Sequence, residues 1–378
     1  MLTLEALRAK HGDALLLHHG TKAKPRLIVI DGGPPGVYPD ALKPRLEQLR
    51  KLQKLEPATP LHVDLVMVSH LDEDHIAGVL ELMQKLRDEE GPKPWTINGV
   101  WHNTFDDILG NKDASIAAEN GPLSPASFGD VLAPEGSLVL ASVGQGRELR
   151  KLVEFFHLEH NPPFAGLVQR GHAPITIGDL TLTVVAPDKE RLQKLQADWD
   201  EKIKPILKKE KTHRAEIAAF IDSSVYNLSS IVVLVESGGK RLLLTGDGRG
   251  DHTLEGLKSA GLLGPDGKLH LDVLKCPHHG SIRNVEEKYF ETIVADHYII
   301  SADGKFDNPD VDTLELISAA RKDDKFTLHL TNPLDKFTKP AIGKAVKKFL
   351  DADHAAGRKY KVNIRAADAL SVQIPLIA

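Results

Sequence analysis

The segment that most constrains the fold is Ser69 to Gly78, SHLDEDHIAG, where potential metal ligands stand between a strand and a helix. The preceding residues, 62–68, are apolar and rich in valine, which predicts a buried strand. Apolar residues then recur at helical spacing and predict an amphipathic helix from residue 75: Ile76, Val79, Leu80, Met83 and Leu86. Turns anchored on both sides in this way project side chains into a cleft.

The ligand types in this turn suit a divalent cation. If the turn is extended, His70, Asp72 and Asp74 alternate to one side, and His75 follows where the helix begins. Carboxylates crowded at this spacing repel one another unless a cation lies between them. The alternative is a solvated acidic loop in which Asp72 or Asp74 caps the helix. The pattern favours one or two metal ions.

Composition narrows the class of protein. At 378 residues, with 41% hydrophobic and 27% charged residues, the chain is typical of a globular protein with one large domain or two. A net charge of −5 provides no general attraction to nucleic acid or anionic membrane. The single cysteine, Cys276, excludes an internal disulfide framework. Without a secretory pattern at the start or a membrane-spanning apolar run, we expect a cytoplasmic protein with no membrane partner.

In the first third of the chain, the pattern of apolar residues predicts strands at 2–7, 14–18, 26–30 and 95–101 and a helix at 42–55, on both sides of the turn at 69–78. The third strand ends in Asp31-Gly32-Gly33, where Asp31 either reaches a site at the sheet edge or fixes a turn. The last of these strands leads into His102.

An irregular segment, about 104–172, interrupts this pattern. We expect it to be an insertion that covers one face, with a helix at 147–160, and to act as a lid over substrate. We expect its histidines His157, His160 and His172 on the surface. Strands return at 174–177 and 180–186, and the charged segment 188–214 predicts a solvated helix and loop.

Two strand ends in the second half carry further ligand types. A hairpin at 229–235 and 240–245 ends in Thr245-Gly246-Asp247-Gly248, where Asp247 either reaches a cation or stands in a turn. The strand 271–276 ends in Pro277-His278-His279-Gly280-Ser281. Adjacent side chains at a strand end face opposite ways, so we expect one histidine to be a ligand and the other to contact substrate or a ligand.

The tail predicts a strand at 298–301, a helix at 310–321, a strand at 326–330, a helix at 340–352 and a terminal hairpin near 360–376.

Taken together, the motifs resemble a known family. The order DGG at Asp31, HLDEDH at His70, TGD at Asp247 and PHHGS at His278 is similar to the metallo-β-lactamase fold superfamily, and within it to the ComEC-type metallo-hydrolase domain and its free-standing relatives. The resemblance extends from residue 1 to about 310. It implies an α/β fold, a four-layer αββα sandwich with the metal site at one edge of the sheets. We expect a single domain over 1–378, with the insertion at about 104–172 and a C-terminal extension at about 322–378.

The resemblance also implies roles. His70 and Asp72 would bind one metal ion, Asp74, His75 and one of the adjacent histidines the other, and Asp247 would bridge both. We take His279 as the ligand and His278, with Asp74 and Asp247, as catalytic. Asp31 would be a buried carboxylate behind the ligands.

This chain departs from the family pattern at the first metal. Many relatives have histidine in place of Asp72, and most have a further histidine in a PGHT-like turn that is absent here. His102 is the nearest substitute. The first site would therefore be weaker and more tolerant of manganese than a three-histidine zinc site. Other residues that could contact substrate or ligands are Asn227, Ser229, Lys275, Ser281 and Arg283. Turn capping explains Asn227 and Ser229 equally well, and surface charge is the commoner explanation for Lys275 and Arg283.

We therefore expect a hydrolase that acts through a metal-bound hydroxide on one or two divalent ions, zinc or manganese. A phosphodiesterase or nuclease is favoured, acting on a small anionic or oligonucleotide-like substrate, since the net charge argues against extended duplex DNA. The alternatives are a hydrolase of lactones, β-lactams or thioesters, and a non-catalytic regulatory protein.

Overall fold

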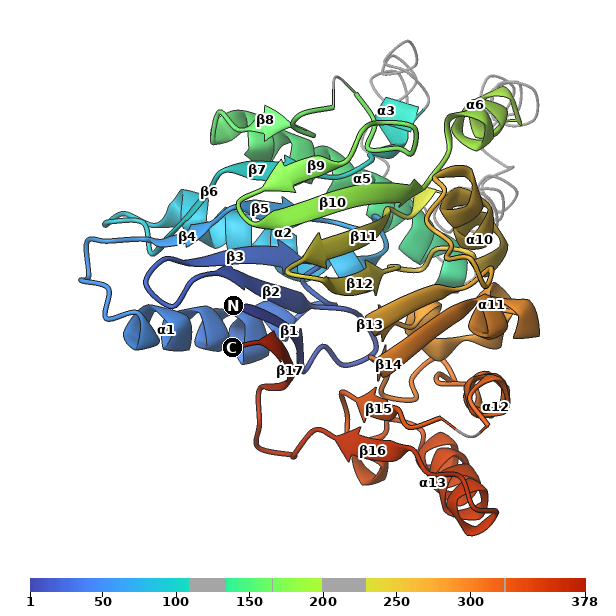
Figure 1. Ribbon diagram of the computed structural model, residues 1–378. Coiled ribbons are helices and arrows are strands. Elements are labelled where there is room, and N and C mark those ends of the chain that lie inside the picture. Colours follow the sequence, from blue (N-terminus) through green and yellow to red (C-terminus); the bar gives the residue numbers. More distant parts are fainter. Residues whose placement is uncertain (109–133, 165, 199–228, 323) are drawn as a thin grey trace.

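The computed structural model describes residues 1–108, 134–164, 166–198, 229–322 and 324–378. Two large sheets face each other, and helices cover the outer face of each (Figure 1). The predicted α/β sandwich with four layers is confirmed. None of the helices in the described ranges combines the length and apolarity needed to cross a bilayer.

The first sheet has the strand order β17-β1-β2-β3-β5-β7-β8. Its strands are β1 (Leu2–Leu7), β2 (Leu15–Gly20), β3 (Pro25–Ile30), β5 (Leu65–Met67), β7 (Gly99–Trp101), β8 (Glu159–His160) and β17 (Ser371–Ile377). A separate pair is formed by β4 (Leu61–Val63) and β6 (Trp95–Ile97). The helices on the outer side of the first sheet include η1 (Tyr38–Leu42), α1 (Lys43–Leu52), α2 (Glu73–Asp88), α3 (Phe105–Ile108) and α5 (Pro134–Phe155).

The second sheet has the order β16-β15-β14-β13-β12-β11-β10-β9. Its strands are β9 (Ile175–Ile177), β10 (Leu180–Ala186), β11 (Val232–Ser237), β12 (Lys240–Leu244), β13 (Leu269–Lys275), β14 (Ile293–Ile300), β15 (Thr327–Leu330) and β16 (Lys361–Ile364). Its outer helices include α10 (Gly250–Ser259), α11 (Glu287–Thr292), α12 (Val311–Ala320) and α13 (Pro340–Ala355), while α6 (Lys189–Asp198) packs Leu192 into the core of the first outer layer. Three short helices complete the described chain: η7 (Pro277–Gly280), η8 (Ile282–Asn284) and η9 (Leu334–Lys336).

Alternating side chains build the layers. In β11, Val233 and Val235 lie between the two sheets, while Val232 and Leu234 face the outer helices. This alternation follows from the two-residue repeat of a strand, and it explains why strands covered on both faces are almost continuously apolar.

Two strands predicted as continuous are each divided. Residues 61–63 pair with β6, whereas 65–67 pair with β3 and β7. The change of partner occurs at Asp64, whose backbone N–H donates to Leu27 O, and the matching break in 95–101 occurs at Asn98. A polar residue in each apolar run marks the point where the chain leaves one sheet for the other.

The predicted terminal hairpin is wrong. β16 pairs in parallel with β15 in the second sheet, while β17 pairs antiparallel with β1 in the first. The apolar face of β17, which includes Val372 and Ile374, is buried, so the strand is held by the first sheet rather than by its neighbour in sequence.

The segment 104–172 differs in part from its prediction. The helix α5 ends at Phe155, earlier than expected, and His160 lies in β8, where it pairs with Val100. The buried face of α5 packs with α2 in the outer layer, so α5 is part of the core rather than a lid. The remainder of the proposed lid, 109–133, lies outside the described residues, as does 199–214 of the charged segment.

Candidate metal centre

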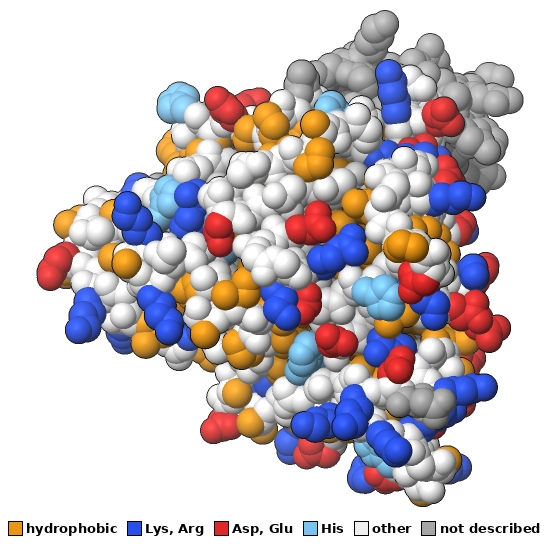
Figure 2. Space-filling model, viewed as in Figure 1, with side chains coloured by type: hydrophobic (Ala, Val, Ile, Leu, Met, Phe, Trp, Pro, Cys, Tyr) orange, Lys and Arg blue, Asp and Glu red, His pale blue; other side chains and the backbone are white. Residues whose placement is uncertain are grey.

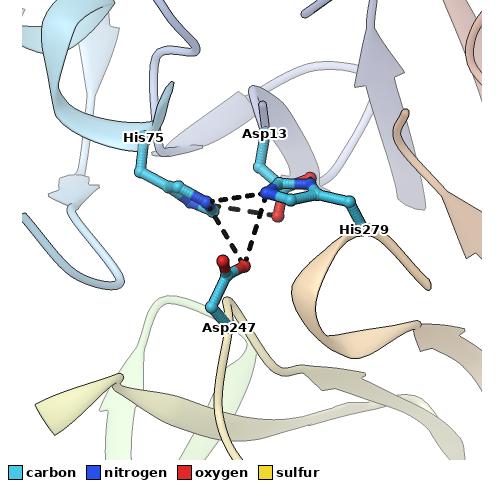
Figure 3. Close-up of side chains that lie close together, drawn as sticks. All are labelled: Asp13, His75, Asp247 and His279. Carbon is cyan, nitrogen blue, oxygen red and sulfur yellow. Dashed lines mark hydrogen bonds and ion pairs between the residues drawn. The ribbon is translucent and has the colours of Figure 1, made fainter. Parts of the chain in front are cut away.

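The site lies at the edge where several strands end. β1, β3 and β5 run in the same direction, as do β12, β13 and β14, so the segments that follow them meet between the two sheets. Asp13, His75, Asp247 and His279 converge there, and their ligand atoms lie within 4.8 Å of one another (Figure 3). His70 and Asp74 form an adjoining group that shares His75.

Asp247 stands at the centre of this site. Its Oδ1 is 3.3 Å from His75 Nε2 and 3.5 Å from His279 Nε2. Its Oδ2 is 3.6 Å from Nε2 of both His70 and His278. Each carboxylate oxygen is therefore approached by two imidazole nitrogens.

Asp74 and Asp72 extend the site on the two sides of Asp247. Asp74 Oδ2 is 3.4 Å from His279 Nε2, on the Oδ1 side of Asp247. Asp72 Oδ2 is 3.5 Å from His70 Nε2, on the Oδ2 side. Asp72 occupies the N-cap position of α2, but its side chain makes no capping hydrogen bond. The helix begins at Glu73, earlier than expected, which places Asp74 in its first turn. The simple capping interpretation of Asp72 therefore fails.

Hydrogen bonds behind the ligands fix the rings. His75 Nδ1 donates to Asp31 Oδ2 at 2.9 Å, and Asp31 also accepts from the backbone N–H and hydroxyl of Ser69 at 2.7 and 2.6 Å. His279 Nδ1 donates to Ser301 O at 3.0 Å. With each Nδ1 used as a donor, the opposite nitrogen is left to bind a metal ion. Asp31 is buried and hydrogen-bonded to His75, and its role in supporting a metal ligand stays a prediction.

His278 is held in the same manner, since its Nδ1 donates to Asn284 Oδ1 at 2.7 Å. Asn284 in turn donates to Asp247 O at 2.8 Å, which ties the His278 turn to the Asp247 turn. His278 is partly exposed, while His279 is buried.

The expectation that His278 and His279 face different ways needs correction. Both have left-handed backbones, with φ of 48° and 55°, so the alternation of an extended strand does not apply. Their Nε2 atoms consequently reach the two oxygens of the same carboxylate. Non-glycine residues in this conformation are uncommon and concentrate at functional sites.

Close backbone contacts bring the turns together. A side chain at Gly246, where φ is 49°, would place its Cβ 2.7 Å from Ser69 Cβ. At Gly78 the Cβ would lie 1.9 Å from Gly32 O. Glycine at these positions lets α2 and the Asp247 turn approach the segments that carry Asp31 and His70.

Charges in the site compensate one another. Burial opposes protonation of both His75 and His279. Asp247 and Asp31 nevertheless raise the pKa of His75 well above its ordinary value, and Asp247 and Asp13 raise the pKa of His279 to about 10. Burial likewise opposes ionisation of Asp247, but the surrounding histidines, His279 foremost, hold its pKa well below the ordinary value. Without another cation, protons on the imidazoles neutralise the carboxylates, and a metal ion would compete with those protons.

The donor set fits a divalent cation. His70 Nε2 and Asp247 Oδ1 are buried and have no hydrogen-bond partner among the residues that the structure describes. Buried polar atoms usually have partners, so atoms left unsatisfied beside further carboxylates and imidazoles indicate a ligand position. The mixture of nitrogen and oxygen donors suits zinc or a harder ion such as manganese.

Asp13 was missed from the sequence. It lies in the β1–β2 connection, with Oδ1 3.5 Å from His279 Nδ1, and Lys275 forms an ion pair with its Oδ2. Burial opposes ionisation of Asp13, but Lys275, with His279 and His75, lowers its pKa to about 2. Gly12-Asp13 looks like an ordinary turn, and only the shared direction of β1, β3 and β5 could have placed it at the site.

The remaining predicted residues have different surroundings. Lys275 is fully buried against Asp13, so it is neither a surface charge nor exposed to substrate. Ser281 is buried and accepts from Arg283 N at 3.4 Å, and Arg283 itself is exposed. Ser229 is buried, but its neighbour Ser230 is the residue that accepts a hydrogen bond from Asp247 N, at 3.1 Å.

Two predicted residues lie apart from this site. Asn227 is outside the described residues. His102 does not join the group around Asp247; it clusters with Asp107 and His160 instead. Of the segment's other histidines, His157 and His172 are exposed as predicted, whereas His160 is not a simple surface residue.

One comparison, with models of protein families, agrees with the fold. A model of the metallo-beta-lactamase superfamily matches residues 22–132, which contain the His70 to His75 turn. Together with the sandwich and the cluster of histidines and aspartates, this match supports that superfamily as the class of the protein. The closer likeness to ComEC-type proteins stays a prediction. Comparison with curated proteins gives no significant match.

Solved structures give distant likenesses over nearly the whole chain. The metallo-beta-lactamase fold protein YhfI from Bacillus subtilis is 12% identical, with a TM-score of 0.39, covering 99% of this chain and 100% of that one. Zn²⁺-bound PqqB from Methylobacterium extorquens is 11% identical, with a TM-score of 0.37 and the same coverage. Unliganded yeast PDE1 is 10% identical, with a TM-score of 0.38, covering 97% and 98% of the two chains. At these scores the likenesses do not bear on the function of this chain.

Proposed function

We propose that this protein is a metal-dependent hydrolase, and specifically a phosphodiesterase or nuclease. The observation that carries the proposal is the arrangement around Asp247, each of whose oxygens is approached by two imidazole nitrogens. Two cations sharing one carboxylate are typical of sites that clamp the attacking and leaving oxygens of a phosphoryl group.

In this proposal, one cation would be held by His70, Asp72 and Asp247. The other would be held by Asp74, His75, His279 and Asp247; the Nε2 atoms of His75 and His279 lie 3.2 Å apart, close enough to serve one ion. Divalent cations here would lower the pKa of water and offset negative charge on a phosphoryl group.

We assign His278 the role of proton donor to the leaving oxygen. Its ring is partly exposed, unlike that of His279, and its Nε2 points to the side of Asp247 where His70 lies. Since Nδ1 is occupied by Asn284, Nε2 is the nitrogen available for proton transfer.

The surface and the ligands favour a small substrate. Figure 2 shows acidic and basic side chains interspersed on the face in view, without the continuous basic stripe that extended duplex DNA requires.

The carboxylates on both sides of Asp247 suit harder ions such as manganese, which are common in phosphoryl transfer. A non-catalytic role is disfavoured, because repelling carboxylates would otherwise have no reason to be buried together.

The test is hydrolysis of bis(p-nitrophenyl) phosphate by protein stripped of metal and then resupplied with Mn²⁺ or Zn²⁺. We expect turnover to return with metal and to be lost in Asp247→Ala, while the exposed, neighbouring Asp251→Ala retains it. Single-stranded DNA, RNA and cyclic dinucleotides would then be compared. No turnover with metal bound, together with hydrolysis of a lactone or thioester, would overturn the phosphodiesterase proposal.

His278→Gln separates the two possible roles of that histidine. If His278 is the proton donor, its replacement should lower kcat while the metal content stays unchanged. The decrease in kcat should be smallest for substrates with a good leaving group. Loss of about one metal ion per chain would instead make it a ligand.

A further inference from the structure

A second group of metal-ligating side chains lies at the edge of the first sheet, beyond the strand that leads to His70. His102 follows β7, His160 ends the adjacent strand β8, and Asp107 belongs to α3. One ligand atom from each lies within 4.8 Å of the others.

His102 is buried and His160 is partly buried. His102 has none of its surface exposed, and neither of its ring nitrogens has a hydrogen-bond partner among the described residues. Nε2 of His160 has no such partner in the described part of the chain either, and the two rings meet edge to face with centroids 4.7 Å apart. Leaving these atoms unsatisfied is costly in an otherwise packed molecule.

The carboxylate of Asp107 is already oriented toward this space. Arg150 forms an ion pair with Oδ1, and Thr104 donates through its backbone N–H to Oδ2 at 3.1 Å. Oδ2 is also the oxygen closest to His160 Nε2, at 3.6 Å. Arg150 therefore holds the carboxylate from one side, and Oδ2, which also accepts from the Thr104 hydroxyl, is the oxygen directed toward the histidines.

We propose that His102, Asp107 and His160 bind a further transition-metal ion of the zinc type, separate from the site at Asp247. Two imidazoles and one carboxylate are a common zinc donor set and leave a coordination position open. An anion is a poorer occupant, because Arg150 is engaged by Asp107 and the carboxylate would repel it. The proposal does not depend on the hydrolytic function.

A bound ion would also have a structural effect. It would join the end of β7, the end of β8 and the short helix α3, which are separate in sequence. Since a metal that binds only the folded state stabilises it, loss of this ion should loosen that part of the outer layer.

The test counts zinc and does not depend on activity. Metal-free full-length protein is titrated with Zn²⁺ against a chromophoric chelator, and bound Co²⁺ is followed by its visible absorption. We expect wild type to bind about one ion more than His160→Ala, with His270→Ala, an exposed histidine near the start of β13, equal to wild type. Asp247→Ala should retain the ion at His102, whatever the substrate of the hydrolase.

Equal zinc content and equal Co²⁺ spectra in wild type and His160→Ala would overturn the proposal. If that variant fails to fold by circular dichroism, His160→Gln and Asp107→Asn provide the same comparison. Their retention of the ion would be equally decisive against it.

Discussion

At the scale of single residues, the candidate metal centre depends on groups outside the set of predicted ligands. Asp31 orients His75, Ser301 orients His279 and Asn284 orients His278. Each of these contacts decides which ring nitrogen faces Asp247, and such supporting contacts typically change metal affinity by about 10- to 100-fold.

Asp31→Asn tests this dependence. The amide cannot accept the hydrogen bonds from Ser69 and His75 as a carboxylate does, and it removes the charge that favours Nδ1–H of His75. We expect the Kd for Mn²⁺ or Zn²⁺ to rise by about 10- to 100-fold. Competition titration measures it, with the exposed Asp40→Asn as control, and an unchanged Kd would show that His75 needs no such support.

Gly78→Ala tests the close approach of α2 to the Asp31 turn. Its Cβ would lie 1.9 Å from Gly32 O, so either the helix or the turn must move. Overpacking of this kind costs about 1–3 kcal/mol or more, and we expect the free energy of unfolding in urea to fall by that amount. Gly91→Ala, which meets nothing closer than 3.8 Å, should change it by less than about 0.5 kcal/mol. Equal stabilities for the two variants would contradict the packing described.

The sequence could point to candidate ligands that are close in sequence but not to a residue that only the topology brings to the site. His70, Asp72, Asp74 and His75 stand in one turn, so their spacing alone suggested that they lie together. In the sequence, Asp13 cannot be told from an ordinary turn residue. Its place at the site follows only from the shared direction of β1, β3 and β5. Likewise, adjacency of His278 and His279 gives no sign of their left-handed backbone.

At the scale of elements, most strands and helices followed from apolar periodicity, while pairing partners did not. The last two strands are near in sequence and were expected to form a hairpin, but β17 completes the first sheet beside β1. Periodicity reports which face of a strand is buried, and it cannot report against which sheet.

Ile374→Ala tests the position of β17. Ile374 is 2% exposed between the two sheets, while its neighbour Gln373 is on the exposed face. Removing buried methylene groups from a core costs about 2–5 kcal/mol, so we expect a loss of that size in the free energy of unfolding. Gln373→Ala should have little effect. Similar small effects for both would mean that β17 does not pack between the sheets.

At the scale of the whole molecule, polar contacts also connect the two sheets. His19 of β2 lies between two carboxylates, 3.0 Å from Asp64 Oδ2 and 2.7 Å from Asp179 Oδ1. Asp179 precedes β10, so His19 links the first sheet to the second. Arg26 donates to both oxygens of Asp64, at 2.8 and 2.6 Å, which makes Asp64 the centre of this cluster.

The Asp64 cluster should make stability depend on pH in the acid range. Burial opposes ionisation of Asp64, but hydrogen bonds from His19 and Arg26 lower its pKa from 3.8 to about 2. A carboxyl whose pKa is lower in the folded state stabilises the fold above its unfolded pKa, near 4. This contribution, on the order of 2 kcal/mol, is lost as pH falls toward about 2.

Asp64→Asn removes the titrating group, so the variant should be less stable than wild type at pH 7, and the difference should narrow between pH 5 and pH 3. Urea unfolding at intervals across this range measures it. Asp335→Asn, whose side chain is 74% exposed, should follow wild type throughout. A difference between wild type and Asp64→Asn that stays constant from pH 7 to pH 3 would show that Asp64 has the same pKa folded and unfolded, and that the cluster acts through packing alone.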